Sequence, residues 1–380
     1  MRVIQRSTRK PLAAVVAALG LAAAVHGSSS LQRLGGDTSC TPTTCEITTS
    51  KVVSLSNRED PELIPDSSMF LVRDRDGRYF VTSRGRDRIL VFDPAGQRQA
   101  ILGQSRPVGP HSDGALQTGD FQLLSSLFIA PDGAVLAFEP RARTFTRISP
   151  ELKIGQPKSF SYAPSLIRPD GSFIVAQQIT TPDLVGQPIH LVSSAGIVIR
   201  SFGSETGDYR ADQPLFTTRV VALGSDDTVW AVPPGRYVID RWNPSRGNRI
   251  SQTVVRSTWF KESPIFRRDQ RLAPNSVVES LWEQDGLLWV LARVADSNWA
   301  APEMANVDRP HNASEYDRTY DWILEAVVQG EGRVAASRRF ANAIWARSSP
   351  PVLVSRFGAT IDVSTVHLVN KKADQKEERK

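Results

Sequence analysis

The stretch Ile129-Ala130-Pro131-Asp132-Gly133-Ala134-Val135-Leu136-Ala137-Phe138 carries the pattern that decides the fold. An Asp-Gly turn leads into an apolar strand, and a second apolar strand, Phe145–Ile148, follows after a polar gap. Asp-Gly between apolar segments is a strong signal for a tight hairpin turn. The stretch therefore predicts antiparallel strands joined by short turns.

The same unit of turn and strands recurs along the chain. The five copies of the turn, each with the strand that follows it, are Asp76-Gly77 before Arg78–Val81, Asp132-Gly133 before Ala134–Phe138, Asp170-Gly171 before Ser172–Val175, Asp226-Asp227 before Thr228–Val232, and Asp285-Gly286 before Leu287–Leu291. A second strand, another turn and in most copies a further strand follow each of them. Repeated units of three or four short strands are typical of the blades of a β-propeller.

A sixth unit is formed by Pro351–Val354 and Ile361–Leu368 together with an N-terminal strand around Ile47–Leu55. Pairing the two ends of the chain would close the ring and leave it without an open break between blades. We therefore predict an all-β chain: a six-bladed β-propeller of four-stranded antiparallel blades, closed by N-terminal and C-terminal strands together.

Two connections between units make the prediction more specific. Ile101-Leu-Gly103 is followed by Gly119-Asp120-Phe121, and Ser201-Phe-Gly203 is followed by Gly207-Asp208-Tyr209. These motifs, with Val81–Phe92, resemble the NHL-repeat and TolB-like six-bladed propellers. The resemblance is partial, because Ser83 stands where that family usually has Asp. It implies a fold, and it implies little about function because propellers host unrelated activities.

The ends of the chain predict an exported protein. Residues 1–27 combine four basic residues with the apolar run Leu12–Val25, which is typical of a signal peptide and short for a membrane-spanning helix. Residues 28–45 form an N-terminal linker, 46–370 a single propeller and 371–380 a disordered charged tail. Cys40 and Cys45 can close a small disulfide loop in an oxidising compartment. We expect a periplasmic or extracellular protein without a membrane span once the signal is removed.

The charge of the chain argues against a nucleic-acid partner. The formal net charge is +6, and residues 1–27 carry four of these charges while the tail 371–380 accounts for the other two. The body between them is close to neutral, and its basic residues form no stripe that could follow a phosphate backbone. We expect no nucleic-acid binding.

Two segments are longer than a blade requires, and both are rich in aromatic and basic residues. Long loops of this kind are often functional, and aromatic and Arg side chains are typical of contact surfaces. The first spans Ser257–Asn275 and the second spans Ala295–Asp321. Their candidate binding residues are Trp259, Phe260, Phe266, Arg267, Arg268, Trp299, His311, Tyr316 and Tyr320. The other interpretation is that these aromatic side chains fold back onto neighbouring blades.

The favoured hypothesis is an exported, monomeric scaffold that binds a protein or a glycan without catalysis. The alternative is a Ca- or Zn-dependent hydrolase or lyase with its site at the central channel, where Glu139, Asp183 and Asp240 are conceivable ligands. No two histidines beyond residue 27 lie at short spacing, and the sequence shows no recognisable nucleophile–base pair. We therefore predict no cofactor, no metal ligand and no identifiable catalytic residue.

Overall fold

The computed structural model describes residues 40–56, 69–83, 86–103, 121, 123–177, 179, 181, 184, 186–203, 218–262, 272–300, 319–341, 344–345, 348–349, 351–357 and 360–371. All of them belong to one compact unit, Leu34–Lys380. The predicted signal peptide 1–27 and residues 372–380 of the predicted tail lie outside the described residues.

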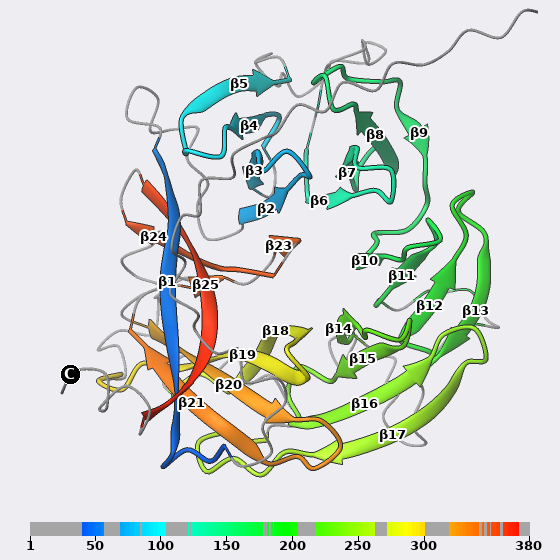
Figure 1. Ribbon diagram of the computed structural model, residues 1–380. Coiled ribbons are helices and arrows are strands. Elements are labelled where there is room, and N and C mark those ends of the chain that lie inside the picture. Colours follow the sequence, from blue (N-terminus) through cyan, green and yellow to red (C-terminus); the bar gives the residue numbers. More distant parts are fainter. Residues whose placement is uncertain are drawn as a thin grey trace, which may run out of the picture. The chain divides into compact units, whose positions relative to one another are not determined.

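Strands of this unit form six sheets arranged in a ring, and helix is almost absent from the residues described above (Figure 1). The first three blades follow the chain in order. Blade 1 holds β2 (Met69–Arg73), β3 (Tyr79–Ser83), β4 (Ile89–Phe92) and β5 (Arg98–Leu102). Blade 2 holds β6 (Ser126–Ile129), β7 (Val135–Glu139), β8 (Thr144–Ile148) and β9 (Lys158–Ser159). Blade 3 holds β10 (Leu166–Ile167), β11 (Phe173–Val175), β12 (Ile189–Val192) and β13 (Val198–Phe202).

The next two blades are built in the same way. Blade 4 holds β14 (Val220–Leu223), β15 (Val229–Val232), β16 (Val238–Asn243) and β17 (Asn248–Val254). Blade 5 holds β18 (Val277–Gln284), β19 (Leu287–Ala295), β20 (Tyr320–Val328) and β21 (Val334–Phe340). Within each of the five blades, successive strands are antiparallel neighbours. The six-bladed propeller predicted from the sequence is therefore confirmed.

The sixth blade joins the two ends of the unit, as predicted. Its strands are β22 (Ile344–Trp345), β24 (Leu353–Phe357), β25 (Thr360–Asn370) and β1 (Cys45–Ser56), hydrogen-bonded in that order. In Figure 1 the blue β1 runs beside the red β25, and their register extends from Cys45 opposite Asn370 to Ser56 opposite Thr360. One further short strand, β23 (Ser348–Ser349), pairs in parallel with β2 and links blade 6 to blade 1.

The five sequence turns occupy the same place in their blades, between the first and second strands. Four of the glycines that close these turns have φ between 75° and 88°. In the fourth copy Asp227 takes this conformation with a φ of 64°, which Asp tolerates better than most residues. Each turn thus needs a residue in the left-handed region, and this need explains the repeated Asp-Gly.

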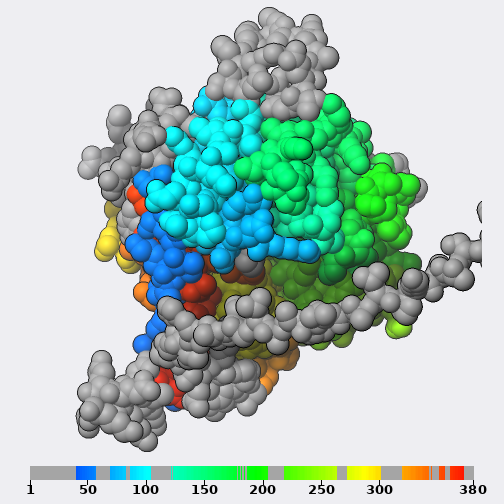
Figure 2. Space-filling model, turned by 45° about the horizontal axis from the view of Figure 1, so that its top comes forward, coloured from blue at the N-terminus to red at the C-terminus, as the bar shows by residue number. Residues whose placement is uncertain are grey.

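The hydrophobic core lies between the blades. Blades 1 and 2 share one cluster that includes Phe80, Ile89 and Val135, and their cyan and green surfaces abut in Figure 2. Similar clusters join blades 2 and 3, blades 3 and 4, and blades 4 and 5, while the largest joins blades 5, 6 and 1. A strand in the middle of a blade is therefore buried on both faces. This explains why strands such as Val229–Val232 are continuously apolar.

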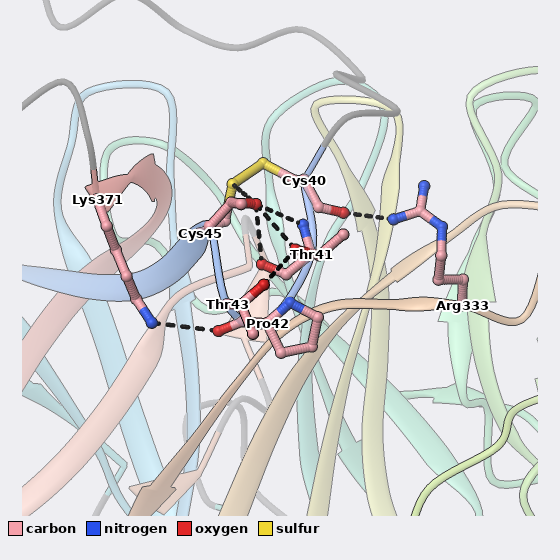
Figure 3. Close-up of a disulfide and its surroundings, with 8 residues drawn as sticks. Cys40, Thr41, Pro42, Thr43, Cys45, Arg333 and Lys371 are labelled. Carbon is pink, nitrogen blue, oxygen red and sulfur yellow. Dashed lines mark hydrogen bonds between the residues drawn. A yellow bond between two sulfur atoms is a disulfide. The ribbon is translucent and has the colours of Figure 1, made fainter.

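Cys40 and Cys45 form a disulfide whose Cα atoms lie 5.5 Å apart. The loop that it closes is bound to two distant parts of the chain, as Figure 3 shows. Lys371 Nζ donates to the Pro42 carbonyl oxygen at 3.1 Å, and the Arg333 guanidinium donates to the carbonyl oxygen of Cys40. The disulfide itself joins residues only five positions apart. In the structure the loop fixes the start of β1 against β25 and blade 5.

Candidate functional site

Both long segments emerge at the same face of the ring. The first connects the last strand of blade 4, β17, to the first strand of blade 5, β18. The second connects the second and third strands of blade 5, β19 and β20. In a four-stranded antiparallel blade these two kinds of connection leave at one end, and the five Asp-Gly-type turns lie at the other. We call the end with these connections the connection face.

Trp259 and Phe260 fold back onto blades 4 and 5. Both side chains are half-buried and pack against the cluster that contains Trp230, Ile239 and Val290. The Phe260 ring lies 5.0 Å from the ring of Tyr237 and 5.5 Å from that of Trp259, measured between centroids. These two candidate residues are thus part of a packed aromatic cluster. Phe266, Arg267 and Arg268 lie outside the described residues.

The aromatic cluster surrounds a buried carboxylate that sequence reasoning missed. Glu325, in the middle of β20, is only 2% exposed. Its Oε2 accepts a hydrogen bond from Tyr237 Oη at 2.7 Å, and its Oε1 accepts one from Trp259 Nε1 at 2.7 Å. Ser257 Oγ also donates to Oε1, at 3.4 Å. No signal in the sequence distinguishes Glu325, because β20 contains another acidic residue, Asp321, and nothing local sets the two apart.

Burial perturbs both acids of this cluster. Removal from water raises the pKa of Glu325 above its ordinary value of 4.5, although the hydrogen bonds from Tyr237 and Trp259 act in the opposite direction. The pKa of Tyr237 is raised well above 10, first by burial and then by the neighbouring carboxylate. Tyr237 therefore remains protonated and keeps donating to Glu325 at neutral pH.

A hollow of about 360 Å³ lies beside the cluster. It is lined by Tyr237, Val255, Arg256, Ser257, Thr258, Phe260 and Glu262. Arg256 and Glu262 are exposed, so the hollow combines an aromatic wall with hydroxyl groups and one charge of each sign. We call it the blade 4–5 pocket. Such a lining can bind a ligand through apolar contact and several oriented hydrogen bonds.

The second segment has a firmly held base. Asp296 N donates to the Thr319 carbonyl oxygen at 3.0 Å, which joins the two ends of the segment. The buried Asp321 accepts hydrogen bonds from Ser297 N at 3.0 Å and from Arg339 Nε at 2.5 Å. Both ends of the segment are thus held to blade 5 by hydrogen bonds.

The candidate residues of this segment have different surroundings from those of the first. The guanidinium carbon of Arg293 lies 4.5 Å from the centre of the Tyr320 ring, so this ring packs against its own blade. Trp299 is half-buried in the turn that follows β19. His311 and Tyr316 lie outside the described residues.

Comparisons with known proteins agree with the fold. No family model matches the chain, and no curated protein resembles it in sequence. A member of the DUF4221 family from Bacteroides vulgatus superposes with a TM-score of 0.55 at 9% identity, over 86% of this chain and 99% of that one. A protein from Bacteroides fragilis described as exported superposes with a TM-score of 0.54 at 12% identity, over 87% and 97%.

A third solved structure, virginiamycin B lyase from Staphylococcus aureus, has a TM-score of 0.44 at 14% identity, over 84% of this chain and 99% of that one. At identities this low, the likenesses to the two Bacteroides proteins show the fold alone. The finer resemblance to NHL-repeat and TolB-like propellers stays a prediction. In the described part of the chain no helix is long and apolar enough to cross a membrane.

In the part of the chain that the structure describes, no cluster of side chains supports the alternative of a metal site. There, no three His, Cys, Asp or Glu side chains gather in a way that could hold an ion. Asp240 belongs to β16 and contacts the outermost strand, where Gln252 Nε2 donates to it at 3.0 Å and Arg249 lies 3.5 Å away. Asp240 thus lies on the third strand of its blade, and its hydrogen-bond partners belong to the outermost strand, β17. Glu139 is fully buried at the end of β7, and Asp183 lies outside the described residues.

A buried His–Ser pair was also missed in the sequence. His190 and Ser201 lie opposite each other on β12 and β13, with 2.7 Å between Nδ1 and Oγ. His190 Nε2 lies 3.0 Å from the Gln177 carbonyl oxygen, which only accepts, so Nε2 carries the proton and Nδ1 accepts from Ser201. The pair ties β13 to the connection that precedes β12. Ser201 also lines a broad hollow of about 620 Å³ on the outside of blade 3.

We expect this histidine to make the protein less stable in acid. Burial lowers the pKa of His190 from 6.5 to about 4, so the unfolded chain binds a proton more readily than the folded one. The contribution of His190 to stability is therefore present above pH 6.5 and is lost as the pH falls towards 4. Between pH 7 and pH 4.5 the loss amounts to about 2–3 kcal/mol.

Urea unfolding of the wild type and of His190→Gln at these two pH values measures this contribution. The difference between the two proteins in their pH dependence isolates His190 from the other acids and bases. Equal pH dependence in both proteins would contradict the assignment.

Proposed function

We propose that this chain is an exported β-propeller that binds a protein or glycan ligand at its connection face and does not itself catalyse a reaction. The observation that carries the proposal is the blade 4–5 pocket. Its aromatic wall is held in place by buried hydrogen bonds to Glu325, while Arg256 and Glu262 stand exposed at its rim. A wall that is already ordered loses little conformational entropy when a ligand binds.

Export to the periplasm or the cell exterior belongs to the same proposal. It is supported by the composition of residues 1–27, by the disulfide between Cys40 and Cys45, and by the similarity in fold to an exported protein. Fractionation of cells that produce the full chain, with N-terminal sequencing of the product, tests both the destination and the cleavage near residue 27.

Binding is tested with purified protein on arrays of glycans and of peptides. We expect a ligand whose affinity falls at least tenfold when Arg256 or Phe260 is replaced by Ala, because each side chain lines the pocket. Lys261→Ala is the matched control, since Lys261 is an exposed residue of the same segment that does not line the pocket. A ligand whose affinity is the same for all three variants would show that the pocket is not its site.

The alternative of a metal-dependent hydrolase or lyase makes a different prediction. Metal analysis of the purified protein would then find calcium or zinc in stoichiometric amount. No observation among the described residues favours this alternative.

A further inference from the structure

The carboxylate of Glu325 is surrounded by hydrogen-bond donors. Tyr237, Trp259 and Ser257 donate to it, and Ser337, which lies opposite it on β21, forms a further side-chain hydrogen bond with it. An ionised carboxylate only accepts, so this environment fits the charged form well. The donors come from three places: the connection before β16, the connection after β17, and blade 5 itself.

A proton on Glu325 would break this arrangement. On Oε1 it would face the indole N–H of Trp259, which can only donate, so the Ser257 hydroxyl, 3.4 Å away, would have to change from donor to acceptor. On Oε2 it would oblige the Tyr237 hydroxyl to accept, and the buried hydroxyl proton of Tyr237 would need a new acceptor. Either way a hydroxyl group that now donates to Glu325 has to accept instead, and its own proton needs another acceptor, because a buried donor left without one is unfavourable.

The groups that face Glu325 carry no charge that would keep its carboxylate ionised in mild acid. Its cross-strand neighbours are Val290 on β19 and Ser337 on β21, neither of which is charged. Tyr237 is the titratable group that contacts it among the described residues, and Tyr237 stays neutral at ordinary pH. Arg256 and Glu262 lie in the connection between β17 and β18, as Trp259 does, but they line the exposed side of the pocket. Burial raises the pKa of Glu325, so it takes up its proton in milder acid than an exposed Glu.

We propose that Glu325 is an acid-operated latch on the blade 4–5 pocket: ionised, it holds Tyr237 in the pocket wall and Trp259 against Phe260, and when it is protonated these aromatic side chains are released. The second half of the proposal, release of a bound ligand in acid, rests on the proposed function of this pocket. The first half concerns the free protein and is tested without a ligand.

The test follows the exposure of the Trp259 indole from pH 8 to pH 4.5. Acrylamide quenching of tryptophan fluorescence is measured in the wild type and in Trp259→Phe, and the difference reports on Trp259. We expect the acrylamide quenching constant of Trp259, obtained from this difference, to rise about twofold in acid. In Glu325→Gln the side-chain NH₂ group faces the same donors and cannot accept hydrogen bonds from them. We therefore expect the Trp259 indole to be exposed already at pH 8, with no further change as the pH falls.

Glu283→Gln is the matched control. Glu283 Oε2 also accepts a hydrogen bond from an indole, that of Trp230, at 2.7 Å, but hydrogen bonds from Ser225 and Trp230 lower its pKa. This variant should leave the transition of Trp259 unchanged. Tyr237→Phe covers the case in which Glu325→Gln fails to fold, because it keeps the carboxylate and the ring and removes one donor. We expect it to move the transition upward by about one pH unit.

The outcomes separate the latch from the proposed function. Exposure of Trp259 that does not change with pH in the wild type, or that changes equally in Glu325→Gln, overturns the latch. A ligand that still depends on Arg256 at pH 7 would support the pocket even then. A transition in the free protein with no ligand on any array would support the latch and count against the pocket.

Discussion

A chain that starts at residue 57 does not close its ring. It lacks β1, which pairs along its whole length with β25 and buries Ile47, Val53 and Leu55 in the cluster shared by blades 5, 6 and 1. Burial of three such side chains contributes about 5–9 kcal/mol, which is comparable to the whole stability of an ordinary domain. We expect this shortened chain to lose its near-ultraviolet circular dichroism and to aggregate through the exposed edge of β25.

A chain that starts at residue 40 is the control for this prediction. It keeps the disulfide and all of β1, so it should unfold at the same temperature as the full chain. A synthetic peptide of residues 45–56, added in trans, should partly restore the near-ultraviolet signal of the chain from residue 57. If that chain unfolded cooperatively at the wild-type temperature without the peptide, the closure would not stabilise the ring.

Replacing Trp289 by Ala is expected to have the largest effect of any single substitution described here. Trp289 lies in the middle of β19, is 1% exposed, and stacks on Trp282 with 6.1 Å between ring centroids. Deleting a buried Trp side chain costs about 3–5 kcal/mol, because the cavity that remains collapses only in part. The melting temperature measured by calorimetry should fall by about 10 °C.

Trp299→Ala provides the comparison, because Trp299 is only half-buried in the turn after β19. We expect it to cost less than about 1 kcal/mol. The contrast distinguishes the packed core between blades from the connection face. Equal losses in the two variants would contradict the assignment of Trp289 to the core.

The fold was predictable because its signals are local. A turn that needs a residue in the left-handed region selects Gly or Asp, and Gly77 and Asp227 show this need in two different copies. The closure was predictable for a related reason. The five repeated units left a sixth unit incomplete near the C-terminus, and the N-terminal strand around Ile47–Leu55 supplied the missing strand.

The candidate site was predicted only in part. The length and composition of the two segments pointed to Trp259, Phe260, Trp299 and Tyr320, and strand order places both segments at the connection face. The prediction that their aromatic side chains form a single surface stays untested. Trp259 and Phe260 pack around Tyr237, while Tyr320 packs against Arg293.

By itself the sequence determined the blades and their turns, because turn residues and runs of apolar residues act over a few neighbouring positions. The pairing of the chain ends followed from the one unit that the repeat left incomplete. Only the tertiary structure decided which polar groups meet. Glu325 is separated from Trp259 by more than sixty residues, yet they share a hydrogen bond across the boundary between two blades. Likewise, His190 meets Ser201 only because β12 and β13 pair in one register. The first contact depends on the packing of two blades and the second on the register of one strand pair, and no local sequence pattern records either of them.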